Sequence, residues 1–203
     1  MRASNTTHDF FGGELMRAST HSGIKREGGF SLLELLVTLA VAGIVMTVAV
    51  PNLRDFSMNA KRAAAVNELV SGIHFARNTA VTRNARVTVC ASTDAATCDS
   101  TEWEDGWIAF VDNDSDQVVD ADETVLRASE EMERATCDSG EFASAFMFRP
   151  NGRIMSNDIA TNTGEFTICD SRGADEARVV IVDMSGRPRT SQYLSDGSTP
   201  ACP

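Results

Sequence analysis

Residues 30–50, FSLLELLVTLAVAGIVMTVAV, decide the fold of this chain, because they form an apolar run that carries one charge, Glu34. At a rise of about 1.5 Å per residue, a helix of roughly 20 residues crosses the hydrocarbon core of a bilayer. Lys25 and Arg26 lie just before the run, and the positive-inside rule keeps that end in the cytoplasm. The stretch therefore predicts one membrane span, with everything after Pro51 on the far side.

The segment before the apolar run is polar and ends in Gly28-Gly29. A positively charged leader of small residues that abuts an apolar stretch predicts a cut between Gly29 and Phe30. An acidic residue at depth in a bilayer costs on the order of 2.5–3.5 kcal/mol, so Glu34 needs a cationic partner. We expect that partner to be the new amino group of Phe30 on a neighbouring subunit. An uncleaved anchor and a secretory signal with Ala40-Val41-Ala42 as its cleavage box are the alternatives.

Beyond the span, apolar residues recur at steps of three and four, which predicts that the helix continues with one apolar face packed on the exported domain. That face comprises Leu53, Phe56, Ala60, Ala63, Val66, Val70, Ile73 and Ala76. We expect the opposite face to be a solvated helix surface. Its charged residues are Arg54, Lys61, Arg62, Arg77 and Arg83, with Asp55 and Glu68.

After Asn84 the apolar period changes to two, which predicts six or seven short strands. The stretches that we expect to form strands are 86–90, 107–111, 124–128, 146–148, 166–169 and 178–182, with a hairpin turn at Pro150-Asn151-Gly152-Arg153 and a second turn at Arg172-Gly173. One long helix followed by antiparallel strands is an α+β arrangement, in which the helix supplies one wall of the core. Trp103, Trp107 and Phe110 are expected core residues.

Composition excludes several classes of function. A net charge of −11 argues against sequence-independent binding of nucleic acid over a broad basic surface. Once residues 1–29 are removed, His74 is the one histidine left, so a histidine triad or a histidine-rich metal site is not expected. We expect no catalytic residue, and no nucleophile stands beside an activating base. An enzyme anchored in the membrane is the disfavoured alternative.

The string from Gly29 to Ala40, with Glu34 fifth after the cut and Pro51 where pilin helices commonly kink, resembles the class III signal of type IV pilins and type II secretion pseudopilins. The exported part is similar to the GspH/FimT group of that superfamily. The segments that carry this similarity are Asn67 to Leu69, Ala76 to Ala80, Val87 to Cys90, Trp103 to Asp112 and Gly186 to Arg189.

The resemblance implies a pilin-like fold and four segments along the chain. These are a cleaved prepilin leader at 1–29, a transmembrane and filament-core helix at 30–51, its amphipathic continuation at 52–84, and a periplasmic β-rich GspH/FimT-like domain at 85–203. It implies cleavage and N-methylation at Phe30 by a prepilin peptidase, and a single-pass inner-membrane protein with a cytoplasmic N-terminus. Its expected partners are membrane lipid, other pilins or pseudopilins and the assembly platform of the inner membrane.

Five cysteines lie beyond the apolar segment, and none forms the close pair that zinc or redox sites use. Disulfides in an oxidising compartment are the better interpretation, with one thiol left over. Fifteen pairings are open on the sequence alone. The family pattern implies Cys90 with Cys98 and Cys169 with Cys202, which leaves Cys137 free.

An acidic loop at residues 112–123 has carboxylates at positions that suit a calcium loop. Asp112, Asp114, Asp116, Asp120 and Glu123 stand at its first, third, fifth, ninth and twelfth positions, and the Val118 carbonyl would fill the seventh. Gln117 replaces the glycine that usually permits the sharp turn there. A polar loop without metal is the alternative, and beyond calcium we expect no cofactor.

Arg187 and Arg189 in Gly186-Arg187-Pro188-Arg189 could straddle adjacent phosphates, because proline keeps the segment extended between two guanidinium groups. In the FimT branch such a motif is associated with DNA uptake in natural transformation. The alternative is an edge strand kept soluble by its arginines. It is favoured by the 16 acidic and 2 basic residues between Asp94 and Glu141, which would repel a polyanion.

We therefore expect a minor pilin or pseudopilin that is a structural subunit of a type IV pilus or a type II secretion pseudopilus. A DNA-binding minor pilin is the alternative.

Overall fold

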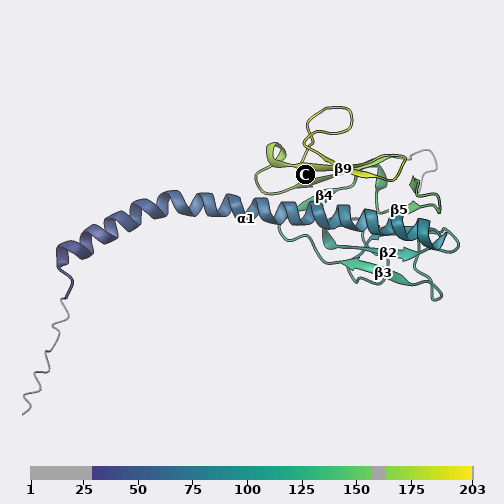
Figure 1. Ribbon diagram of the computed structural model, residues 1–203, viewed down its shortest axis with the longest axis horizontal. Helices are drawn as coiled ribbons and strands as arrows, with labels where there is room; N and C mark the ends of the chain where they lie inside the picture. The colour runs from purple at the N-terminus through teal and green to yellow at the C-terminus, as the bar shows by residue number, and fades with distance from the viewer. Residues whose placement is uncertain (1–28, 157–162, 203) are drawn as a thin grey trace, which may run out of the picture. The chain divides into compact units, whose positions relative to one another are not determined.

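The computed structural model describes residues 29–156 and 163–202, and most of the predicted leader lies outside these residues. One long helix, α1, runs from Leu32 to Arg83 and contains Pro51 (Figure 1). The chain divides into two compact units, Met1–Met46 and Thr47–Pro203, which are described separately below. Helical structure continues through Pro51, and the predicted kink there stays a prediction.

In the first unit, α1 begins after Ser31, whose Oγ accepts a hydrogen bond from the backbone N–H of Glu34 at 3.2 Å. Serine followed three residues later by glutamate is the sequence pattern of a capping box, and a carboxylate in the first turn suits the helix dipole. The helical residues of this unit are exposed, and α1 is the one helix in the described parts of the chain that is long and apolar enough to span a membrane.

The second unit contains two antiparallel sheets, whose strands form because β-branched and aromatic residues alternate or run together. The five-stranded sheet has the order β3-β2-β1-β5-β6, and the four-stranded sheet has the order β4-β7-β8-β9. Their bounds are β1 Val87–Ala91, β2 Trp107–Val111, β3 Val125–Ser129, β4 Thr136–Asp138, β5 Ala145–Phe148, β6 Ile154–Ser156, β7 Gly164–Cys169, β8 Arg178–Val182 and β9 Pro188–Ser191. Among the described residues, three short 3-10 helices interrupt the connections, η1 Trp103–Asp105, η2 Gly140–Phe142 and η3 Ala174–Glu176.

The main core lies between the second half of α1 and the inner faces of both sheets. Leu69, Ile73 and Ala80 of the helix are at most 1% exposed, and they join one cluster with residues of β1, β5, β7 and β8. Trp103 stacks on Phe146 at 5.6 Å between ring centroids and meets the edge of Phe166 at 4.9 Å. The fold is thus α+β and pilin-like, as the sequence predicts.

The second cluster covers the opposite face of the five-stranded sheet, where Cys90, Ile108, Phe110 and Ala145 are buried. Phe110 is therefore a core residue, as expected, but it belongs to this smaller cluster and not to the one under the helix. Two-sided burial explains why β1 and β2 are almost continuously apolar.

Three expectations about this unit are wrong. The described residues form nine strands and not six or seven, because β4 and β6 have three residues each and β9 begins with proline. Leu53 and Phe56 are 68% and 70% exposed, because the domain covers the helix only farther along, and Ala60 and Ala63 are exposed because the buried side of the helix there carries Arg62 and Val66. The charged face is not fully solvated, since Arg62 is 6% exposed and Arg77 is half-buried.

Arg62 is buried because it joins α1 to the connection between β7 and β8. Its guanidinium lies 3.4 Å from the Asp170 carboxylate and 3.2 Å from that of Glu176. Arg172 binds the same Asp170 carboxylate at 2.6 Å. Paired charges of this kind are the ones that a protein interior tolerates, so an arginine on the predicted polar face fixes the helix to the four-stranded sheet.

Candidate functional site

The first candidate site is the start of α1, where processing and assembly are predicted. Gly29 and Phe30 precede the helix, and Phe30 is 81% exposed. Glu34 is exposed, and no ion pair involves its carboxylate within the described residues. An exposed carboxylate in an exposed apolar helix is the arrangement that an intermolecular cation would complete.

The second candidate site is the connection between β8 and β9, which contains Gly186 to Arg189. Gly186 has a φ of +70°, and a Cβ there would come within 2.4 Å of the carbonyl oxygen of Gly152. The backbone N–H of Gly186 donates to the carbonyl of Asp183 at 2.8 Å, which closes the turn. Only glycine fits this conformation beside a neighbouring backbone, so the turn fixes where the following arginines emerge.

The two arginines of this segment are exposed but have different surroundings. Arg189 lies in β9 opposite Ile181 and lines a small pocket with Glu165 and Asp183. Hydrogen bonds from Ser185 chiefly hold the pKa of Asp183 below its ordinary value, and the positive charge of Arg189 adds to this effect. Neither arginine forms an ion pair with any described residue. Of the two, Arg187 is the freer to meet an anion, because the charge of Arg189 already acts on Asp183.

Arg77 is a residue of this site that the sequence did not single out for it. Its Nε donates to the carbonyls of Gly152 and Ser185, both at 3.2 Å. One guanidinium therefore ties α1 to the turn between β5 and β6 and to the turn that precedes Arg187. No local pattern could have revealed this, because the three segments lie 75 and 108 residues apart.

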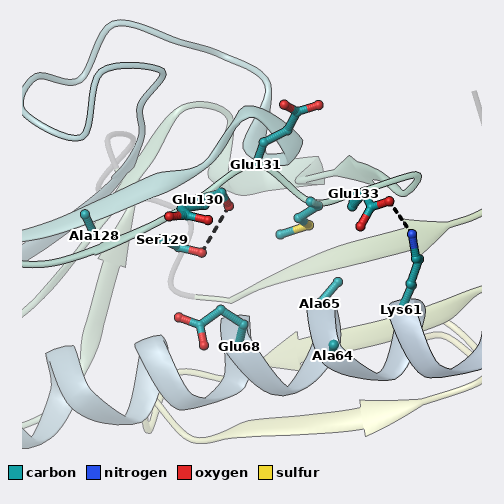
Figure 2. Close-up of a pocket in the computed structure, with 10 residues that line it drawn as sticks. Lys61, Ala64, Ala65, Glu68, Ala128, Ser129, Glu130, Glu131 and Glu133 are labelled. Carbon is teal, nitrogen blue, oxygen red and sulfur yellow. Dashed lines mark hydrogen bonds and ion pairs between the residues drawn. The ribbon is translucent and has the colours of Figure 1, made fainter.

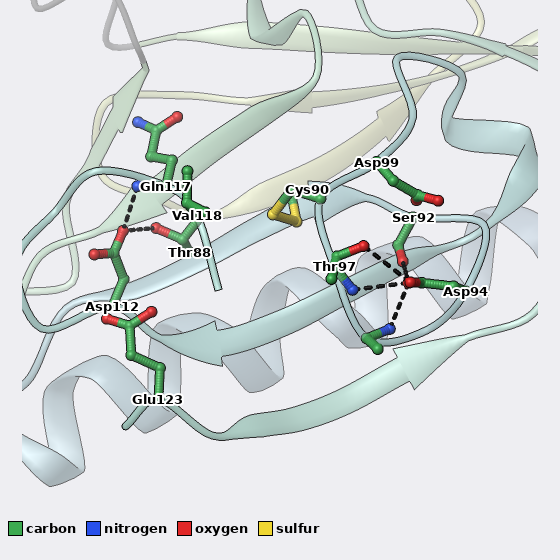
Figure 3. The surroundings of a disulfide bond; sticks show 12 residues. Thr88, Cys90, Ser92, Asp94, Thr97, Asp99, Asp112, Gln117, Val118 and Glu123 are labelled. Carbon is green, nitrogen blue, oxygen red and sulfur yellow. Dashed lines mark hydrogen bonds between the residues drawn. A yellow bond between two sulfur atoms is a disulfide. The ribbon is translucent and has the colours of Figure 1, made fainter. Parts of the chain in front are cut away.

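The third candidate site is the acidic loop between β2 and β3 (Figure 3). Asp112, Asp114 and Asp116 each bring a carboxylate oxygen within 4.8 Å of the others. Asp112 is fully buried and accepts a hydrogen bond from the Thr88 hydroxyl at 2.7 Å and another from the Gln117 N–H. Gln117 has a φ of +65°, so it adopts the glycine-like conformation that such a loop needs at this position.

The remaining two predicted ligands are not part of that group of three. The Glu123 carboxylate accepts hydrogen bonds from the backbone N–H groups of Asn113 and Asp120 and so closes the loop on itself. Desolvation first, and then the carboxylates of Asp116 and Asp114, raise the pKa of Asp120. The structure thus brings together three of the five predicted calcium ligands, and metal binding stays a prediction.

The cysteines stabilise the loops around these sites. Disulfides join Cys90 to Cys98 and Cys169 to Cys202, the two pairs that the resemblance implied. Cys137 has a free thiol, and its burial, with Glu104 and Asp138 nearby, strongly raises its pKa. A thiol with a raised pKa is a poor nucleophile at neutral pH, so Cys137 is a packing residue.

Comparison with known proteins agrees with this geometry. The family model of the type II transport protein GspH matches residues 65–186, and that of the prokaryotic N-terminal methylation motif matches residues 24–50. The GspH match ends at Gly186 and so leaves out Arg187 and Arg189. No curated protein sequence matches the chain.

Two crystal forms of one minor pilin share the fold. The type IV minor pilin FimU of Pseudomonas aeruginosa is 20% identical in one crystal form, with a TM-score of 0.53 over 71% of this chain and 96% of that one. A second crystal form of FimU gives 19% identity and a TM-score of 0.51 over 68% and 96% of the two chains. The minor pseudopilin EpsH of Vibrio cholerae is 11% identical, with a TM-score of 0.44 over 64% and 96%. Since the GspH model covers more than half of the 203 residues, the chain belongs to the type II transport protein GspH family of pilin-like subunits.

Proposed function

We propose that this GspH-family chain is made as a prepilin, cut after Gly29, methylated on the amino group of Phe30, and packed by α1 into a filament. Its family makes it a minor pilin or pseudopilin, a structural subunit of a type IV pilus or of a type II secretion pseudopilus, and such subunits are not enzymes. The observation that carries the proposal is a capped helix that starts inside the methylation motif and exposes its apolar residues.

Glu34 supplies the specific contact in this proposal. In lipid or in a bundle of helices, the Glu34 carboxylate is costly unless a cation pairs with it. The cation in this proposal is the amino group of Phe30 on the next subunit, and Phe30 stands four residues before Glu34 in the sequence. Before assembly the subunit would sit in the inner membrane with a cytoplasmic N-terminus and a periplasmic domain, beside the processing peptidase and the assembly platform. The exposed Leu53 and Phe56 extend the apolar surface that neighbouring helices could cover.

The test is mass spectrometry of the chain together with its recovery in sheared filaments. The expected N-terminus is methylated Phe30, and Glu34→Gln should reduce recovery in the filament fraction because a neutral amide cannot pair with the amine. Glu102→Gln, an exposed carboxylate on the domain, is the matched control and should leave recovery unchanged. A leader that remains attached in cells with an active peptidase would overturn the proposal.

A second function, DNA binding by the same subunit, is favoured by one observation: the exposed Arg187 has no ion pair within the described residues, while Arg77 holds its turn in place. The acidic loop follows β2 at the end of the five-stranded sheet where the turn after β5 also lies, since Val111 and Phe148 both pair with Val87, so its charge opposes the approach of DNA from that side. Phosphate contacts by two guanidinium groups would make retention strongly salt-dependent.

The DNA test compares retention of double-stranded DNA by the full chain and by the Arg187→Ala/Arg189→Ala double variant over a range of salt. Two lost phosphate contacts should lower the slope of log affinity against log salt by about 2. Arg134→Ala, at an exposed arginine outside this turn, is the control. Unchanged retention and slope in the double variant would reject DNA binding by this motif.

A further inference from the structure

The four-stranded sheet is buried on both of its faces. Phe166 of β7 and Val180 of β8 point into the main core under α1. Because side chains alternate along a strand, Val179 and Ile181 of β8 belong to the opposite face, which we call the outer face. These two residues are nevertheless only 0% and 4% exposed. Another part of the chain must therefore cover the outer face.

The C-terminal tail, residues 192–202, is fastened to this outer face at two points. At the first, the backbone N–H and the hydroxyl of Ser195 donate to the Glu165 carboxylate at 2.9 Å and 2.8 Å. At the second, a disulfide joins Cys202 to Cys169. Glu165 and Cys169 lie on the same face of β7, about 13 Å apart at roughly 3.3 Å per residue, so the tail runs beside the strand from one to the other (Figure 1).

The tail covers the apolar strip that lies between its two fastenings. Ser195 and Ile181 line one small pocket at the first fastening, and Pro200, two residues before Cys202, is buried. Without the tail, Ile181 and its neighbour Val179 would be in contact with water, close to the edge strand β9. An exposed apolar strip beside a sheet edge promotes aggregation, so the tail protects this face of the domain.

The fastening at Ser195 is too weak to hold the tail without the disulfide. Its hydrogen bonds are exposed to water, which competes for both partners. Leu194, Pro200 and Cys202 are the tail residues that are not exposed, so the tail buries little apolar surface to offset the entropy lost in ordering it. The covalent bond reduces that loss, because it keeps Ser195 near Glu165 at a high effective concentration.

We propose that residues 192–202 are a redox-sensitive strap: the Cys169–Cys202 disulfide latches it over Val179 and Ile181, and reduction opens it while the rest of the domain stays folded. The inference rests on the proposed function, in which the domain passes from the reducing cytoplasm into an oxidising compartment. Closure forms the Sγ–Sγ bond and releases two protons and two electrons, which a disulfide of a second protein accepts as it becomes a dithiol. The strap therefore closes only after export, and open chains are lost to aggregation before assembly.

Limited proteolysis of the full chain in detergent micelles separates opening of the strap from unfolding of the domain. Chymotrypsin cuts after large apolar and aromatic residues, so Tyr193 and Leu194 report on the strap. Met132 is the internal reference, because it is 8% exposed in the groove between α1 and residues 128–133, and a cut there requires this loop to leave the helix (Figure 2). Cleavage of a folded chain follows the population of the locally open form.

Cys169→Ser/Cys202→Ser removes the latch, and Cys90→Ser/Cys98→Ser, which removes the other disulfide, is the matched control. Without the latch, cleavage in the strap should be about tenfold faster than in the wild type and leave one stable product, while the control should keep the wild-type rate. Wild type treated with dithiothreitol should behave like the variant without the latch, which excludes an effect of the serines. An unchanged rate in the strap, or cleavage at Met132 as fast as in the strap, would overturn the proposal.

Thiol trapping in cells tests the role of the latch in assembly. A dose of dithiothreitol that leaves part of the chain reduced should give free Cys169 and Cys202 thiols in the membrane fraction and nearly none in sheared filaments. Equal reduced fractions in membranes and filaments would overturn this role. Methylated Phe30 and normal filament recovery in that case would leave the proposed function intact, whereas a retained leader would reject the proposed function itself.

Discussion

Gly72→Ala should destabilise the exported domain, although the same change usually stabilises a helix. Replacing glycine by alanine inside a helix gains about 1 kcal/mol of helix propensity. At Gly72, however, the added Cβ would lie 2.2 Å from Cη2, 2.4 Å from Cζ2 and 3.0 Å from Cζ3 of Trp107. These atoms belong to a rigid ring that is fully buried, so the ring or the helix must move.

The clash outweighs the gain in propensity. Overpacking a core by one methyl group costs typically 1–3 kcal/mol, and this contact is closer than real Cβ atoms make, so the upper part of that range applies. The net loss is then about 1–2 kcal/mol in the free energy of unfolding. For a unit of this size each kcal/mol lowers the melting temperature by about 2–4 °C. We therefore expect a loss of several degrees.

Tryptophan fluorescence measures this change selectively, because the chain has two tryptophans and both are buried in the second unit. Ala63→Gly, at an exposed position of the same helix, should cost about 1 kcal/mol through propensity alone and so calibrates that effect. Trp107→Leu should lower the free energy of unfolding less in the Gly72→Ala protein than in the wild type, because it removes the ring that clashes with the added Cβ. A Gly72→Ala protein as stable as the wild type would refute the close helix–sheet contact and the reasoning built on it.

Three further predictions concern the loops. The hydrogen bond from Arg172 chiefly lowers the pKa of Asp170, so the ionised Asp170 stabilises the fold above its ordinary pKa of 3.8, and this stability is lost as the pH falls through the lower folded pKa. Between about pH 5 and pH 2 the wild type should therefore lose more free energy of unfolding than Asp170→Asn. Parallel pH profiles of the two proteins would contradict this. Removing the Cys169–Cys202 disulfide, which spans 33 residues, should lower the free energy of unfolding by about 3.7 kcal/mol. Removing Cys90–Cys98, which spans 8 residues, should lower it by about 2.5 kcal/mol, and chemical denaturation should show this order. If the acidic loop holds calcium, the ion should raise the melting temperature of the wild type and not that of Asp114→Asn/Asp116→Asn, and an unchanged wild type would end the calcium hypothesis.

The helix and most of the sheet could be predicted because their signals are local. The apolar run at 30–50 and the three-and-four spacing after it indicate α1. Alternation identifies β1, and a short apolar run identifies β8, almost to the residue. β4 and β6 lack such a signal, because they are too short to show a period. β9 begins with a proline, which argues against a strand except at a sheet edge, and it forms the edge strand that the alternative interpretation of Arg187 and Arg189 predicts.

The candidate surfaces depend on sheet topology, which no local pattern carries. Net charge and the 16 acidic residues between Asp94 and Glu141 describe an acidic protein, yet Arg149, Arg153 and Arg187 emerge together from the turns after β5 and β8. Helical spacing alone places Glu68 and Arg77 on opposite sides of α1, but the sign of each side comes from the segments packed beside it. Arg62 lies on the helix face that is predicted to be solvated, yet the connection between β7 and β8, more than 100 residues away in the sequence, buries it. A charge count over a window therefore predicts solubility better than it predicts binding, and the arrangement of the charged surfaces follows only once helix and sheets are packed together.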